Sequence, residues 1–356
     1  MADALCGRLT VPDPEAISSS VIGIAPGRDH RIRTLPVVVL FPHNRCNCRC
    51  VMCDIWRIGQ AREISAEDLE PHIESFRELR VRWIVFSGGE PQMHTDLSTL
   101  SHLLRAEGIR LTLLTSGLLL EAQAPSIAET IDDVIVSVDG PPEIHDQIRR
   151  VHKAFNRLAR GVQALRKVRP DMVIRGRSTV QKANFTYLRR TIAAARQLSL
   201  NSISFLAADV ASEAFNRSGG WPVKRQSAVA LGPDEIALLE QEVEFLIQEH
   251  PDDLASGFVV ESAEKLRRIV RHFRAQLGEL PPVAPTCNAP WVSAVIEADG
   301  TVRPCFFHRS LGNVHEKTLI EILNGDIAVD FRQRLDILNN PVCQKCVCSL
   351  HLSEAL

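Results

Sequence analysis

Short apolar runs alternate with longer amphipathic stretches between about residues 35 and 208. Six of these runs have the length of buried strands: 36–41, 82–86, 110–114, 133–138, 172–180 and 201–206. Helical periodicity fills the gaps between them, over 65–79, 96–107, 121–130, 143–168 and 185–198. Strands that alternate with helices favour a parallel sheet with helices outside. Right-handed crossovers would curl six such units into a full or partial barrel, with binding loops at the carboxyl ends of the strands.

The alternation stops after residue 208. Residues 211–230 are rich in loop formers, residues 233–279 have a helical pattern, and Pro281–Pro285 indicates a linker. Ala294–Val302 predicts a hairpin that turns at Asp299-Gly300. We therefore predict four regions: an N-terminal extension over 1–34, an α/β core over 35–210, a loop and helical connector over 211–282, and a small hairpin-plus-helix domain over 283–356.

Composition and charge narrow the choice of partners. The 356 residues are 45% hydrophobic and 24% charged, with a net charge of −2, so no excess of basic charge suggests nucleic acid or an anionic membrane. No apolar run approaches the roughly 20 residues of a membrane helix, and the N-terminus lacks the pattern of a secretory signal. We expect a soluble, cytoplasmic protein. The basic stretch 149–177 is interpreted as a solvated face.

The ten cysteines are grouped rather than scattered. Apart from Cys6, four lie between Cys46 and Cys53, five lie between Cys287 and Cys348, and none lies between these two groups. A disulfide framework is typical of small secreted domains, which this chain does not resemble. Two thiolate groups in a reducing compartment predict two metal sites instead.

Cys46, Cys50 and Cys53 follow the first predicted strand, with three and then two residues between them. In a short loop, this spacing brings three thiolates to one metal centre. A cubane cluster normally takes four cysteines, so three leave one iron open to another ligand. An open coordination position distinguishes a catalytic site from a closed structural one.

This C-x3-C-x2-C spacing resembles that of the radical S-adenosylmethionine (SAM) superfamily. The resemblance implies a 4Fe–4S cluster, held by Cys46, Cys50 and Cys53, whose open iron binds SAM. It also implies reductive cleavage of SAM to a 5′-deoxyadenosyl radical that abstracts hydrogen from a substrate C–H bond. Met52 stands where the family commonly has an aromatic residue, and Cys48 is interpreted as a thiol that is not a ligand.

Three further stretches support the resemblance. Phe86-Ser-Gly-Gly-Glu-Pro91 ends the second predicted strand and resembles the GGEP motif that binds the SAM amino group. Leu114-Thr-Ser-Gly117 ends the third and Val136-Ser-Val-Asp-Gly-Pro141 the fourth, and the latter resembles the branch of the family that has a SPASM domain. The implied SAM contacts are Gly88, Gly89, Glu90, Pro91, Ser116, Ser137 and Asp139. Arg149 and Arg175 are alternative partners for a SAM carboxylate.

The C-terminal cysteines resemble a SPASM or twitch extension, in which a hairpin framed by two cysteines precedes a C-x2-C pair. This implies one auxiliary 4Fe–4S cluster, and the expected ligands are Cys287, Cys305, Cys343 and Cys346, with Cys348 as an alternate to Cys346. Spacing alone equally allows structural zinc in an all-cysteine site. The expected architecture is thus a partial (β/α)6 TIM-type barrel with a SPASM/twitch-like C-terminal domain.

The substrate does not follow from the sequence. Relatives with SPASM domains favour maturation of a ribosomally made peptide, with the auxiliary cluster assisting oxidation or cross-linking. The alternative is oxidation of a small-molecule alcohol such as a sugar or aminocyclitol, and a more distant one is a non-catalytic iron–sulfur or zinc protein. The reducing partner would be an acidic flavodoxin or ferredoxin.

Overall fold

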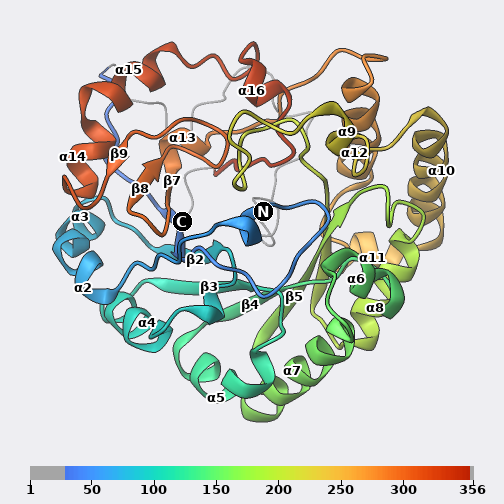
Figure 1. The fold of residues 1–356 in the computed structure, drawn as a ribbon, viewed down its shortest axis with the longest axis horizontal. Coiled ribbons are helices and arrows are strands. Elements are labelled where there is room, and N and C mark those ends of the chain that lie inside the picture. Colours follow the sequence, from blue (N-terminus) through green and yellow to red (C-terminus); the bar gives the residue numbers. More distant parts are fainter. Residues whose placement is uncertain (1–28, 353–356) are drawn as a thin grey trace.

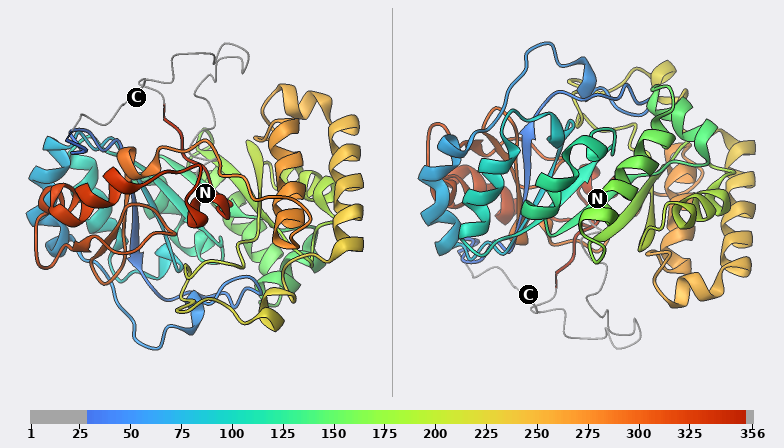
Figure 2. Two further views of the ribbon diagram at one scale, coloured as in Figure 1. Left: turned by 90° about the horizontal axis from the view of Figure 1, so that it is seen from above. Right: turned by 90° about the horizontal axis from the view of Figure 1, so that it is seen from below.

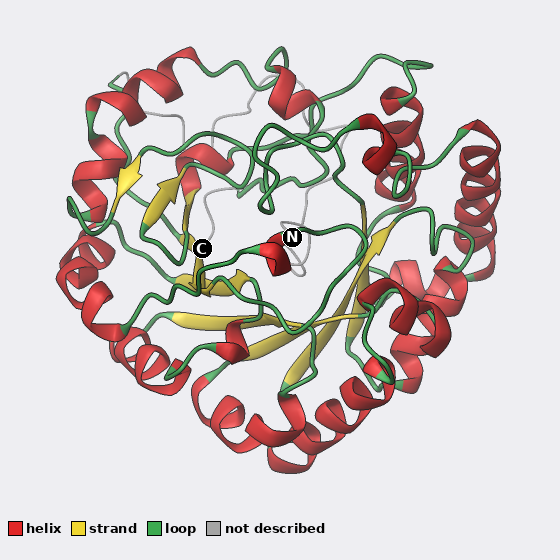
Figure 3. Cartoon of the chain, viewed as in Figure 1, coloured by secondary structure: helices red, strands yellow, loops and turns green. Residues whose placement is uncertain are grey.

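In the computed structural model, residues 29–352 are described, so most of the expected 1–34 extension lies outside them. The structure contains one curved sheet with helices outside it (Figures 1 and 3). Six parallel strands follow one another in the order of the sequence. They are β1 (Val37–His43), β2 (Trp83–Gly88), β3 (Arg110–Thr115), β4 (Asp133–Ser137), β5 (Val173–Val180) and β6 (Ser202–Ala207). Each begins and ends within about two residues of its predicted bounds, which confirms the partial (β/α)6 barrel.

Helices connect the strands along the outer face of the sheet (Figure 1). Their bounds are α2 (Ala66–Leu69), α3 (Ile73–Glu78), α4 (Leu97–Ala106), α5 (Leu120–Thr130), α6 (Pro142–Arg149), α7 (Ala154–Val168) and α8 (Leu188–Gln197). Three short 3-10 helices interrupt the loops: η2 (Ile55–Arg57), η3 (Glu70–His72) and η4 (Pro91–Met93). Helix α2 begins with a capping box, because Asp68 N–H donates to the Ser65 hydroxyl and the Asp68 carboxylate accepts from Ser65 N–H.

One predicted helix is wrong. The stretch 143–168 forms two helices, because Arg150 and Lys153 adopt left-handed conformations with φ of 53° and 55°. Phe155 N–H donates to the Asp146 carboxylate across the break, which holds the start of α7 against α6. The break allows Arg149 to turn inward, where only 9% of its surface is exposed.

The connector packs beside the end of the barrel. It consists of α9 (Val223–Gln226), α10 (Pro233–Glu249), α11 (Pro251–Ala255) and α12 (Ala263–Gln276). Helix α10 contacts α8 and α12 contacts β6, so these helices cover the open edge of β6. Among residues 29–352, no helix has both the length and the apolar composition needed to cross a membrane.

The C-terminal hairpin continues the barrel sheet. Strand β7 (Ser293–Ile296) pairs in parallel with β1, while β8 (Thr301–Arg303) and β9 (Gly312–Asn313) extend the sheet in antiparallel fashion. The remaining helices are α13 (Ala289–Val292), α14 (Leu319–Asn324), α15 (Asp326–Arg334) and α16 (Pro341–Gln344). Val302 and Leu319 belong to the same hydrophobic cluster as Val38 and Leu40, so the barrel and the hairpin share one core.

Candidate active site

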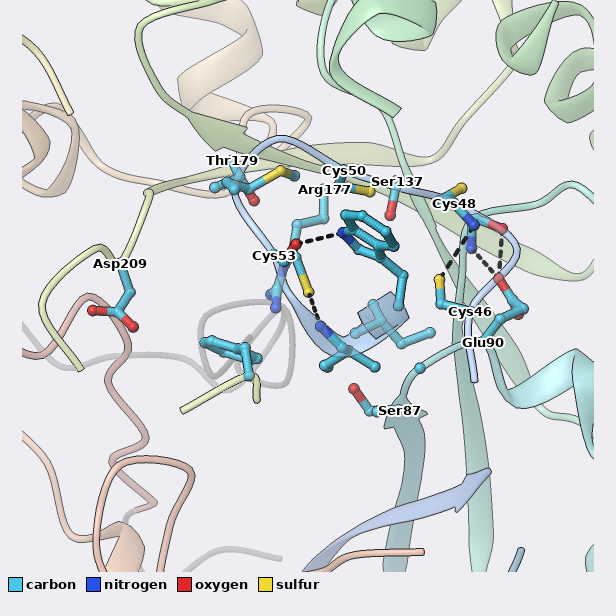
Figure 4. Close-up of a pocket in the computed structure, with 18 of the residues that line it drawn as sticks. Cys46, Cys48, Cys50, Cys53, Ser87, Glu90, Ser137, Arg177, Thr179 and Asp209 are labelled. Atoms are coloured by element: carbon cyan, nitrogen blue, oxygen red, sulfur yellow. Dashed lines mark hydrogen bonds between the residues drawn. The ribbon is translucent and has the colours of Figure 1, made fainter. Parts of the chain in front are cut away.

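Cys46, Cys50 and Cys53 lie in the loop between β1 and η2, at the carboxyl end of β1, and all three line one pocket (Figure 4). We call residues 45–54 the cluster loop. Its backbone is fixed to the end of α6, since Arg49 N–H donates to Arg149 O at 3.1 Å and Val51 N–H to Ile148 O at 3.1 Å. The three expected ligands therefore line one cavity, and hydrogen bonds to the end of α6 hold the loop that carries them.

Three thiols of this loop, those of Cys48, Cys50 and Cys53, have a raised pKa. Burial raises the pKa of Cys53 to about 12. A hydrogen bond with Cys48 and burial together raise the pKa of Cys50 well above its usual value, and a hydrogen bond with Cys46 raises that of Cys48 to about 12. Thiolate formation in such a place needs nearby positive charge, so iron binding would release these protons.

The donor set fits an iron–sulfur cluster. Three cysteines within eight residues face a common pocket, and thiolates are the usual ligands of such clusters. Within residues 29–352, no three histidine, cysteine or acidic side chains are arranged to hold a metal ion. The fit therefore rests on the chemistry of the donors and on their common pocket.

The end of β2 is packed against the cluster loop, and this explains its two glycines. A Cβ atom on Gly89 would lie 2.1 Å from the carbonyl oxygen of Arg45, and one on Gly88, which has φ of 98°, would lie 2.6 Å from the Phe41 ring. Glu90 N–H donates to Arg45 O at 2.8 Å, and Gly89 N–H points to His43 O at 3.4 Å. The N–H groups of Gly89 and Glu90 are thus directed at backbone carbonyls at and just after the end of β1.

The Glu90 carboxylate joins the ends of β2 and β3. It accepts hydrogen bonds from Ser116 N–H at 2.8 Å, from the hydroxyls of Ser116 and Thr115, and from Gln92 N–H at 3.2 Å. Burial raises the pKa of Glu90, and these hydrogen bonds oppose the shift. Because a carboxylate offers about four acceptor sites, Glu90 mainly positions the Thr115-Ser116 turn. Figure 4 shows it beside Cys46.

The expected SAM contacts fall into two groups, those that line the pocket and those that do not. Gly88, Gly89, Glu90, Ser116 and Ser137 line the pocket, whereas Pro91 and Asp139 are not among its lining residues. Pro91 begins η4 and is buried. Asp139 is completely buried and paired with Arg149 Nη2 at 2.6 Å, and it also accepts from Thr179 N–H. The structure therefore does not support direct contact of Pro91 or Asp139 with SAM.

Arg149 is a pocket residue that periodicity misassigned to a solvated face. Its Nη1 lies 3.6 Å from the sulfur of Cys50. Burial opposes its charge, but the attraction of Asp139 raises its pKa above the ordinary value, so the guanidinium stays charged. Arg175, the alternative carboxylate partner, instead binds Asp133 at 3.0 Å and does not line the pocket.

The five C-terminal cysteines line a second pocket. Burial raises the pKa of Cys305 to about 12 and that of Cys343 to about 11. The Cys346 thiol donates to Cys348 O at 2.9 Å, and His308 Nε2 lies 3.4 Å from the Cys343 sulfur. Cysteines from the start of α13, the end of the hairpin and α16 thus meet in one place, although they are up to about sixty residues apart in sequence.

The two pockets share part of their wall. Phe306 and Cys348 line both, so the C-terminal segment forms one side of the cavity that holds Cys46, Cys50 and Cys53. Phe306 stacks on Phe41 at 5.9 Å and on Phe215 at 6.4 Å between ring centroids. An apolar, aromatic wall therefore stands between the two groups of cysteines.

Comparison with known proteins identifies both regions. Residues 40–179 match the radical SAM superfamily. Residues 287–347 match the SPASM family, an iron–sulfur cluster-binding domain. This second match favours iron–sulfur over the zinc alternative for the C-terminal cysteines. The two matches support 4Fe–4S clusters and SAM as the cofactors.

Curated relatives align over different lengths of the chain. Fe-coproporphyrin III synthase of Methanosarcina barkeri is 35% identical over 131 residues, which are 36% of this chain and 33% of that protein. PqqA peptide cyclase of Ruegeria pomeroyi is 25% identical over 315 residues, which are 85% of this chain and 77% of that protein. The chain spans between a third and a half of the first three curated relatives, at 33%, 38% and 45% of their lengths.

Solved structures share the fold over most of the chain. Streptococcus suis SuiB bound to SAM has a TM-score of 0.62 at 14% identity, covering 90% of this chain and 74% of SuiB. The anSMEcpe structure with bound SAM has a TM-score of 0.64 at 20% identity, covering 87% of this chain and 86% of the other. These likenesses extend beyond the barrel to the region that follows it.

Proposed function

Because the chain belongs to the radical SAM superfamily and carries a C-terminal SPASM domain, we propose that it cleaves SAM reductively and oxidises or cross-links a peptide at a C–H bond. With its cofactors bound, a four-iron cluster in the cluster loop would supply the electron for SAM cleavage, and SAM the radical that takes the hydrogen atom. The protein itself contributes binding, orientation and exclusion of water.

Cys46, Cys50 and Cys53 are the proposed ligands of this cluster. Gly88 and Gly89 let β2 approach the cluster loop closely enough to place SAM beside it. Ser116 and Ser137 present hydroxyls to the pocket, and Arg149 supplies a fixed positive charge beside Cys50. A charged guanidinium in this position suits a carboxylate and a thiolate equally well.

The C-terminal cysteines are the proposed ligands of the auxiliary cluster, with Cys287, Cys305, Cys343 and Cys346 as the set. Their pocket adjoins the first through Phe306, so an electron removed from a substrate has a short path to this second site. Such an arrangement suits a two-electron oxidation, in which the substrate loses a hydrogen atom to the SAM-derived radical, an electron to the auxiliary cluster, and a proton.

The proposal that the substrate is a peptide rests on one observation. The alignment with PqqA peptide cyclase covers 315 residues, 85% of this chain, whereas those with the first three haem-related relatives extend over only 131 to 161 residues. Resemblance over most of the chain bears on the substrate more than resemblance over less than half of it. The aromatic wall offers an apolar surface for side chains of such a peptide.

The test begins with anaerobically reconstituted protein. Dithionite and SAM are expected to give 5′-deoxyadenosine and methionine, detected by liquid chromatography and mass spectrometry, and about eight irons per chain are expected for two four-iron clusters. A variant with Cys46, Cys50 and Cys53 all changed to Ala should give no 5′-deoxyadenosine and retain about four irons. Absence of 5′-deoxyadenosine from wild-type protein with full iron content would sink the proposal.

The substrate class needs its own measurement. Short peptides encoded next to the gene, made synthetically, should increase 5′-deoxyadenosine formation and lose two mass units for each two-electron oxidation. The matched comparison uses a sugar or aminocyclitol alcohol under the same conditions. Mass loss in the alcohol and none in the peptides would reverse the assignment of substrate.

A further inference from the structure

A segment outside both matched regions lies along the cluster loop. Residues 209–226 follow β6, while the matches cover 40–179 and 287–347. In Figure 2 this segment, in yellow, lies at the same end of the barrel as the blue loop that follows β1. We call it the 209–226 segment.

Two arginines of the 209–226 segment bind backbone carbonyls of the cluster loop. Arg217 Nη2 donates to Met52 O at 2.6 Å, and Arg225 Nη2 donates to Val51 O at 2.8 Å. Carbonyls in an irregular loop have no partner in a sheet or helix, and a buried one left without a partner is costly. The two arginines supply these partners immediately before the third cysteine.

A second pair of contacts holds the residue that follows Cys53. Trp221 Nε1 donates to the Asp54 carboxylate at 2.6 Å, and Asn216 Nδ2 donates to Asp54 O at 3.0 Å. Cys53 is thus flanked on both sides by residues that the 209–226 segment holds. Its own sulfur accepts from Ile55 N–H at 3.5 Å.

Arg217 is itself rigidly held. Only 3% of its surface is exposed, and its Nη1 donates to both the backbone oxygen of Asp209, at 2.7 Å, and its carboxylate, at 2.9 Å. The guanidinium carbon lies 4.0 Å from the centre of the Trp221 ring. A planar guanidinium presents five donors in a fixed fork, and the three rotatable donors of a compact ammonium group do not reproduce this geometry. Asp209, which lines the pocket, is committed to Arg217 and to its own turn.

The backbone of the segment is strained where it approaches the site. Phe215 and Asn216 have φ of 60° and 63°, and such values are uncommon for asparagine and unusual for a bulky aromatic residue. Strain of this kind persists only where surrounding contacts fix the conformation, and it is frequent at functional sites. The conformation places Phe215 in the pocket wall and Arg217 against the cluster loop.

We propose that Arg217 is a positioning residue for the iron–sulfur cluster of Cys46, Cys50 and Cys53, which we call the barrel cluster. By linking the end of β6 to Met52 O, Arg217 holds Cys53 where this cluster can form and SAM can reach it. This inference rests on the proposed function, because it assumes that Cys53 is a cluster ligand. It predicts that losing the link harms the barrel cluster and spares the auxiliary one, whose cysteines lie in the other pocket.

The experiment compares iron content and spectra of whole, anaerobically reconstituted protein. Arg217→Gln and Arg217→Lys should each lower iron from about eight to about four per chain. The electron paramagnetic resonance change that wild-type protein shows when SAM is added to the reduced enzyme should be lost. Lys224→Gln removes one positive charge from an exposed position of the same segment and should match wild type in both readouts.

Each outcome decides a separate question. If wild type binds no barrel cluster, the proposed function fails before Arg217 is considered. If wild type binds two clusters and both Arg217 variants do too, with an unchanged response to SAM, the inference about Arg217 is overturned. If the Arg217 variants unfold and lose both clusters, the Trp221→Phe variant tests the proposal instead. It removes the hydrogen bond to the Asp54 carboxylate and keeps an aromatic ring beside Arg217. A smaller loss of barrel iron and a changed response to SAM would support the proposal, and wild-type behaviour would overturn it.

Discussion

The two groups of cysteines are built in opposite ways. The cluster loop takes its three expected ligands from eight consecutive residues after a single strand, and its support comes from elsewhere: Arg149 from α6 and Arg217 from the segment after β6. The C-terminal site takes its ligands from three separate places, and its support is partly local: the Asn340 side chain caps α16 by accepting from Cys343 N–H, while Arg268 of α12 donates to Cys346 O at 3.3 Å. One site is compact in sequence and dependent on distant contacts, and the other is dispersed in sequence.

The two sites therefore depend on different contacts for their geometry. The cluster loop has no regular structure of its own, so its geometry depends on how the barrel closes around it. The C-terminal cysteines are attached to a hairpin and short helices, so their positions follow from the sheet and the caps.

Changing Cys53 to Ala should abolish formation of 5′-deoxyadenosine, because it removes one of three proposed thiolates from a site that has no spare ligand. Changing the neighbouring Cys48 to Ala should leave most of the activity, since its thiol lies outside the C-x3-C-x2-C spacing. Chromatographic assay of SAM cleavage with both variants checks this. Equal loss in both would mean that Cys48 takes part in binding the cluster.

At the C-terminal site, Cys346→Ala should lower iron by about four per chain, while SAM cleavage persists. Formation of oxidised product should be lost, because the auxiliary cluster is the proposed electron acceptor. Cys348→Ala should keep its iron. Iron analysis of the two variants side by side decides which of the two is the fourth ligand, and iron loss only in Cys348→Ala would exchange their roles.

Arg149→Gln should lower the free energy of unfolding by about 3–5 kcal/mol, because it leaves the buried Asp139 carboxylate without its partner. Changing Asp139 to Asn in the same chain should recover much of this loss, since the uncompensated charge is then gone. Urea unfolding of the wild type, both single variants and the double variant measures the coupling. Additive effects would show that the pair contributes little.

The support under the cluster loop should also weaken in acid. Burial lowers the pKa of His145 from 6.5 to about 4 in the folded protein. As the pH falls below about 6.5, the unfolded chain binds a proton before the folded one does, so the free energy of unfolding decreases down to about pH 4. His145 contributes no pH dependence above that range. His145→Asn keeps an acceptor for Asp139 N–H and should flatten this part of the profile, measured by urea unfolding at several pH values.

The barrel could be predicted from sequence because its strands are apolar on both faces. Val37, Ile84 and Val134 lie in runs that periodicity identifies, and each is buried in the sheet. The cluster loop and the GGEP motif could be predicted for a similar reason, since each is a local pattern that follows a strand. Their direct contact, in which Gly89 faces Arg45 O, depends on how neighbouring strands align.

Contacts between polar residues that are far apart in the sequence could not be predicted. Arg149 was placed on a solvated face because helical periodicity ignores a partner such as Asp139, ten residues earlier in a loop. Arg217 follows a loop of ordinary composition, and no pattern indicates that its partners are Asp209 and Met52 O. The hairpin was predicted, but its place beside β1 was not, because alternation does not specify which strand will be the neighbour.

The pairing of β7 with β1 has a consequence for how the chain is made. Val37 lies beside Ser293. Strand β1 is therefore made early in synthesis, but one of its edges has no hydrogen-bonding partner until β7 has been made. Until then, β1 has an exposed edge, which can pair with the strands of other molecules. A chain cut between the connector and the hairpin would keep every residue of the barrel and still have this open edge. The auxiliary domain therefore completes the barrel's sheet, and expression of the barrel alone should yield aggregated protein.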